Sequence, residues 1–89
     1  MTYKRQEFLA HANLDEETLQ IWLHEEWLIP AHDDSDEAWV EADIARANLI
    51  QDLRHHMGVN DQGVSIVLHL LDQLHDLRRA MDGLAQGRS

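Results

Sequence analysis

The stretch LDEETLQIWLHEEWLIP, residues 14–30, decides the fold of this chain. Asp15 is a good helix N-cap, and the two glutamates after it fall in a first helical turn, where negative charge suits the helix dipole. Apolar residues then recur at helical spacing and predict one buried stripe: Leu19, Trp22 and Leu23, bracketed by Leu14 and Trp27. Pro30 disfavours helix before it, so WLIP (27–30) lies outside the helix. The stretch predicts a short acidic helix with one buried face.

The flanking segments extend this pattern on both sides. RQEFLAHA (5–12) predicts a short helix, and Asn13 suits a left-handed turn residue between the two helices. WLIP and the later WV (39–40) are short apolar pieces around the polar loop AHDDSDEA (31–38), which predicts a small β-hairpin, or wing. A third helix is expected from residue 41 onward, with Gly58 as its stop. We therefore expect three short helices and a wing within residues 1–58.

The last third of the chain predicts one long helix that begins after a cap at Asn60. Apolar residues repeat along it with alternating spacings of three and four, which is a coiled-coil pattern. We expect residues 59–89 to pack on the first part, within a single domain, and to form a homodimer through the far end of the helix. The predicted dimer residues are Leu70, Leu74, Leu77, Met81 and Leu84. The alternative is that the whole helix folds back onto its own domain.

Composition excludes several classes of protein. The 89 residues contain no cysteine, which excludes disulfides and thiolate chemistry and favours a reducing cytoplasm. The N-terminus lacks the apolar core of a signal peptide, and no apolar run approaches the length of a membrane span. We therefore expect a soluble cytoplasmic protein that has no membrane association.

The negative charge is concentrated in one region. The net charge is −10, and between Gln6 and Ala45 there are twelve Asp and Glu residues and no Lys or Arg. Such a region either keeps the surface solvated or steers a basic partner toward it. Both interpretations argue against nucleic acid as a partner, because phosphates would be repelled. Nucleic-acid binding would require Lys4, Arg5, Arg46 and Arg54 to gather into one patch.

No constellation of residues supports catalysis. The HEEW sequence starting at His24 lacks the second histidine of a zinc-protease motif, because position 28 is Leu28. His55 and His56 are adjacent, so on a helix they point about 100° apart. The paired carboxylates have no apolar pocket around them, and no glycine-rich phosphate loop is present. The sequence predicts no catalytic residue, no metal site and no cofactor, and the protein is expected not to be an enzyme.

Several segments together resemble a known family. EFLAHANLDEETL (7–19), WLIP, Trp39 and LRHHMGVNDQGVSIVLHLLDQLHDL (53–77) are similar to the CbpM family, whose members modulate the DnaJ-type co-chaperone CbpA. The layout of the whole chain also resembles the DNA-binding half of MerR-type regulators. The resemblance implies an all-α, MerR-like winged helix-turn-helix fold followed by a long C-terminal helix.

The CbpM resemblance also implies a function. It implies an inhibitor that binds the basic J-domain of a DnaJ/CbpA-type co-chaperone and blocks its productive contact with Hsp70. A MerR-type DNA-binding transcriptional regulator is the alternative. On the acidic helix, Ile21 lies off the buried stripe and is a candidate apolar anchor for the J-domain. The predicted partner-binding residues are Glu16, Glu17, Gln20, Ile21, His24 and Glu25, and the alternative binding faces are the third helix and the groove beside the long helix. The tryptophans are expected in the core.

Overall fold

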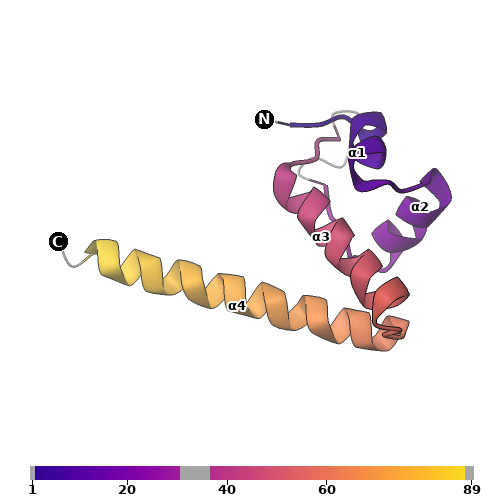
Figure 1. Ribbon diagram of the computed structural model, residues 1–89. Helices are drawn as coiled ribbons and strands as arrows, with labels where there is room; N and C mark the ends of the chain where they lie inside the picture. Colours follow the sequence, from indigo (N-terminus) through magenta and orange to yellow (C-terminus); the bar gives the residue numbers. More distant parts are fainter. Residues whose placement is uncertain (1, 31–36, 88–89) are drawn as a thin grey trace. The chain divides into compact units, whose positions relative to one another are not determined.

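The computed structural model describes residues 2–30 and 37–87, with side chains up to residue 84. The elements are α1 (Arg5–Ala12), α2 (Glu16–His24), α3 (Glu41–Gln51), the π-helical turn η1 (Asp52–His56) and α4 (Asp61–Gly87) (Figure 1). The chain divides into two compact units, Met1–Gly58 and Val59–Ser89. The predicted all-α fold with a long last helix is confirmed.

A three-residue turn joins α1 to α2, and its chemistry is the predicted one. Asn13 has φ 57°, in the left-handed region, and Leu14 N–H donates to Leu9 O at 3.0 Å to close the end of α1. Asp15 then caps α2, because its Oδ1 accepts from Thr18 N–H at 2.7 Å. Local side-chain chemistry therefore fixes this helix-turn-helix.

A second left-handed residue, Glu26, ends α2, and this was not predicted. Glu26 has φ 61°, and Trp27 N–H donates back to Trp22 O at 2.9 Å. The two indole rings lie 6.1 Å apart, so a hydrophobic contact accompanies the backbone closure, as is common at helix ends of this type. The closure directs the chain after α2 back onto the core.

The predicted β-wing is absent from the part of the chain that the structure describes. Trp39 forms an isolated antiparallel bridge with Tyr3, with N···O distances of 2.7 and 2.9 Å, and does not pair with WLIP. Trp27 cannot serve as a ladder residue, because its N–H caps α2 and its carbonyl accepts from Arg46 Nε at 2.6 Å. The expected hairpin loop lies mostly within 31–36, outside the described residues.

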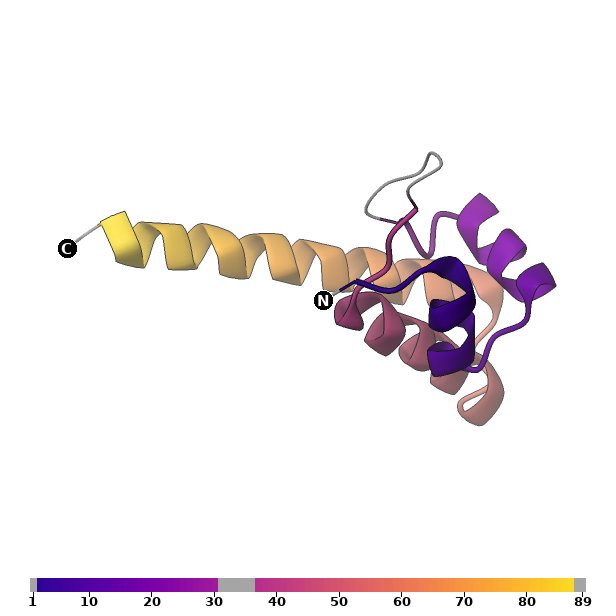
Figure 2. The same cartoon turned by 90° about the horizontal axis from the view of Figure 1, so that it is seen from above.

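The core of the first unit is built on aromatic side chains. The Phe8 and Trp39 rings stack with centroids 4.2 Å apart and planes 8° from parallel, and α1 lies beside α3 (Figure 2). The predicted core positions of the three tryptophans are confirmed. The buried residues of this unit are Phe8, Ala12, Leu19, Trp22, Trp27, Leu28, Trp39, Ala47, Ile50 and Leu53.

The third helix is not a continuous α-helix. Its α-helical part stops at Gln51 and continues as η1, where Met57 N–H donates to Asp52 O at 3.1 Å. Gly58 follows with φ 67°, a conformation that costs glycine little. The predicted stop at Gly58 is therefore confirmed, whereas the π-helical turn before it was not predicted.

The last helix, α4, begins at the predicted cap, where Asn60 Oδ1 accepts from Gly63 N–H at 2.8 Å. The five predicted dimer residues are exposed in the single chain, by between 48% and 72%. Their spacing places them along one side of the helix. The dimer itself stays a prediction.

Candidate protein-binding face on the second helix

All six residues predicted to bind a partner are exposed at α2 and its C-cap, Glu25. Leu19 and Trp22 on the same helix are buried, so α2 has one face in the core and another in solvent. We call Glu16, Glu17, Gln20, Ile21, His24 and Glu25 the α2 face. Ile21 keeps 53% of its surface exposed, as the sequence predicted.

One member of the α2 face already holds a cation. Arg5 of α1 lies with Nη2 at 2.5 Å from Glu16 Oε1, and its Nε donates to Glu16 Oε2 at 3.2 Å. Arg5 Nη1 donates to Glu37 at 3.1 Å, so one guanidinium joins two carboxylates distant in sequence. The hydrogen bond from Arg5 lowers the pKa of Glu16 below its ordinary value.

Two other carboxylates of the α2 face have no cationic partner within the described residues. Glu17 and Glu25 accept no side-chain hydrogen bond and form no ion pair within the described residues, whereas Glu16 also accepts from Gln20 Nε2 at 3.4 Å. The sequence did not predict that Glu16 is paired with a cation while Glu17 is not. Arg5 is the last cation before a long acidic region, which indicates that it pairs with a carboxylate, but which carboxylate it pairs with depends on how α1 and α2 fold together.

Three of the four cations of the first unit contact groups within it. Arg5 is bound between Glu16 and Glu37. Arg46 donates to the carbonyl of Trp27, and the Arg54 guanidinium lies 6.0 Å from the Trp27 ring centroid. Arg46 and Arg54 therefore contact the same tryptophan, whereas the charge of Arg5 is offset by two carboxylates.

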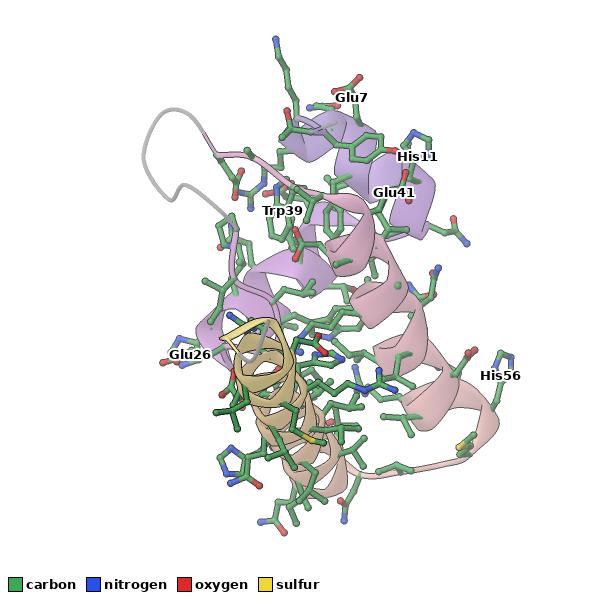
Figure 3. The ribbon with its side chains drawn as sticks, turned by 90° about the vertical axis from the view of Figure 1, so that its left-hand side faces the viewer. Glu7, His11, Glu26, Trp39, Glu41 and His56 are labelled. Carbon is green, nitrogen blue, oxygen red and sulfur yellow. The ribbon has the colours of Figure 1, made fainter. Side chains whose placement is uncertain are left out.

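A second polar cluster surrounds Tyr3. The Tyr3 hydroxyl donates to Glu41, and its ring lies 4.9 Å from that of His11. The bond to Glu41 raises the pKa of Tyr3, since the carboxylate favours the protonated phenol. Figure 3 shows Glu7, His11 and Glu41 near one another, at the ends of α1 and α3, and Glu26 well away from them. This cluster ties the N-terminal segment to α3.

The described residues contain no group of three His, Asp or Glu side chains arranged to hold a metal ion. His56 instead pairs with Asp52 one turn earlier, at 2.9 Å, on an exposed surface. No helix in the described part of the chain has both the length and the apolar character needed to cross a membrane.

Comparison with known proteins gives one match. The model of a family described as MerR HTH family regulatory protein matches residues 3–86, which is nearly the whole chain. No curated protein and no solved structure matches.

Proposed function

We propose that this chain, which belongs to the MerR HTH family of regulatory proteins, regulates by binding a protein and not DNA. The proposed partner is the J-domain of a DnaJ/CbpA-type co-chaperone, and the proposed effect is inhibition of its productive contact with Hsp70. The likeness of residues 7–19 and 53–77 to the CbpM family supports this assignment. The action is binding, without catalysis, and the proposed compartment is the cytoplasm.

The exposed charge of the α2 face is the main observation behind the proposal. In helix-turn-helix proteins that bind DNA, the second helix enters the major groove and cations contact the phosphates. Here that helix exposes Glu17 and Glu25, and Ile21 lies between them. A polyanion would be repelled by this surface, whereas a basic helix would be attracted to it.

The distribution of charge between the two units supports the same partner. Residues 1–58 hold thirteen of the seventeen Asp and Glu residues and four of the seven Lys and Arg residues. Three of those four cations contact groups inside the unit, namely Arg5, Arg46 and Arg54. The negative field is therefore strongest around the unit that carries the α2 face, which would accelerate encounter with a cationic partner.

The proposed mechanism is competition for one surface. J-domains present a basic helix to Hsp70, as the family resemblance implies, and the α2 face would cover that helix. Glu16, Glu17 and Glu25 set the association rate and orientation, Gln20 and His24 provide hydrogen bonds, and Ile21 slows dissociation. Leu70, Leu74, Leu77, Met81 and Leu84 form the apolar stripe of α4. Dimerisation through this stripe would present two α2 faces in one assembly.

Calorimetric titration of the full chain with a purified J-domain tests the proposal. We expect binding that weakens as salt rises, since exposed charges are screened over about 8 Å at physiological ionic strength. The same J-domain should lose its stimulation of Hsp70 ATPase when this protein is added. The double variant Glu16→Lys, Glu17→Lys should weaken both effects while its circular dichroism spectrum stays unchanged. No binding to any J-domain of the source cell would refute the proposal.

The second candidate is a DNA-binding transcriptional regulator, which the family match favours as much as the first. It predicts a shifted band in a gel-mobility assay at low salt with the DNA upstream of its own gene. We expect no shift, because the α2 face is acidic. A shift at nanomolar protein that a nonspecific competitor does not remove would favour the regulator instead.

A further inference from the structure

The exposed side of α2 carries a regular row of three residues: Glu17, Ile21 and Glu25. They are four positions apart, so they follow one another along the helix at intervals of about 6 Å and span about 12 Å. The helical backbone continues to the end of the row, because Glu25 has φ −76° and ψ −6°. We call these three residues the α2 row.

The two carboxylates of the α2 row form no ion pair within the described residues, whereas the neighbouring Glu16 is paired with Arg5. Glu16 is bound by Arg5, with Nη2 at 2.5 Å. Within the described chain neither end of the row has an ion-pair or hydrogen-bond partner for its carboxylate, and Ile21 in the middle is 53% exposed. The row therefore offers negative charge, apolar surface and negative charge again, in that order.

We propose, building on the proposed function above, that the α2 row selects one pattern in its partner helix: a cation, an apolar residue one turn later, and a second cation one further turn on. Two side chains seven or eight positions apart on a helix are separated by about 10–12 Å, which equals the span of the row. The occupant is thus a basic amphipathic helix whose cations share one side with an aliphatic residue.

Spacing matters because steering and pairing are different effects. A partner with the same number of cations on scattered sides of its helix gains the same long-range attraction, which depends on total charge. Only cations in register with both glutamates form two close pairs while the apolar residue covers Ile21. The row is symmetric about Ile21, so charge alone permits either direction of the partner helix.

Double-mutant cycles between the full chain and an intact J-domain test this inference. On one side the variants are Glu17→Gln and Glu25→Gln; on the other, each Lys and Arg of the basic helix is changed singly to Gln. Dissociation constants are measured by calorimetry. We expect Glu17 to couple with one cation and Glu25 with another seven or eight positions away, each by at least about threefold in affinity. Asp82→Asn, an exposed residue of α4, is the control with the same charge change.

The outcomes separate this inference from the proposed function. Coupling of both glutamates to two cations at that spacing supports the row. If the J-domain binds but the couplings are absent, or fall on cations at other spacings, the row is refuted while the proposed function stands. If Asp82→Asn couples equally with the same cations, the effect is long-range attraction and the row is also refuted. If no J-domain binds, the proposed function fails.

Discussion

Arg5 and Glu16 form an ion pair across the helix-turn-helix, with Nη2 at 2.5 Å from Oε1. The same guanidinium also holds Glu37, so α1, the start of α2 and the segment before α3 meet at one cation. The pair therefore has two consequences. It links parts of the first unit that are distant in sequence, and it neutralises one carboxylate of the α2 face.

Removing that cation should change stability and binding in opposite directions. Arg5→Gln releases Glu16 and Glu37, so we expect a melting temperature lower by a few degrees, since exposed and half-exposed ion pairs contribute little each. Affinity for a J-domain should rise about threefold, because a local positive charge is lost and a carboxylate is freed. The control Lys4→Gln removes the same charge from an exposed side chain. Equal effects of both variants in calorimetry and thermal melting would contradict this role of Arg5.

Acid should weaken the fold through α2. Hydrogen bonds from Arg5 and Thr18 lower the folded-state pKa values of Glu16 and Asp15. A carboxylate whose pKa is lower in the folded state than in the unfolded state stabilises the folded chain at pH values above its unfolded-state pKa. This stabilisation is lost as the pH falls through the folded-state pKa, so the free energy of unfolding should drop below about pH 4.5. The stability difference between the wild type and Glu16→Gln should shrink in the same range. Urea titrations from pH 7 to 3 measure it, and a constant difference across that range would be inconsistent with the shift.

The end of α2 contains avoidable backbone strain. Glu26 has φ 61°, which costs a residue with a Cβ roughly 1 kcal/mol relative to glycine. Glu26→Gly should therefore raise the free energy of unfolding by about 1 kcal/mol. The matched control is Glu25→Gly, one position earlier at φ −76°, which should destabilise the chain. Urea denaturation monitored by tryptophan fluorescence measures both, and equal destabilisation would contradict the assignment of strain.

Ile21 should contribute more to binding than to folding. Ile21→Ala should weaken J-domain binding about tenfold, as expected for a central apolar contact, and lower the melting temperature by no more than a few degrees, because the residue is 53% exposed. Ile29 is a matched control, since it is an isoleucine 67% exposed and outside the α2 face. Should Ile29→Ala weaken binding as much as Ile21→Ala, the docking surface would extend beyond the α2 face.

The apolar stripe of α4 should hold two chains together. Leu74→Glu and Leu77→Glu place charge at the centre of the predicted seam, where burial of an unpaired carboxylate is costly. Each variant should sediment as a monomer at concentrations where the wild type is a dimer. His75→Glu, exposed on the same helix and outside the stripe, should remain dimeric. A monomeric wild type at tens of micromolar would rule out the dimer.

Local chemistry in the sequence determined the helices, the caps at Asp15 and Asn60, the left-handed turn at Asn13 and the exposure of Ile21. Each depends on residues within about two helical turns, so spacing and side-chain type were sufficient. The burial of Trp22 also followed from this periodicity.

Tertiary structure alone decided which partners distant residues took. Trp39 pairs with Tyr3 and not with WLIP, and the N–H and carbonyl of Trp27 are bonded to Trp22 and Arg46. Arg5 pairs with Glu16, and not with another carboxylate close in sequence, because folding places the start of α2 beside α1. Such pairings depend on how helices pack and on which backbone groups remain free, and a linear pattern of residue types encodes neither.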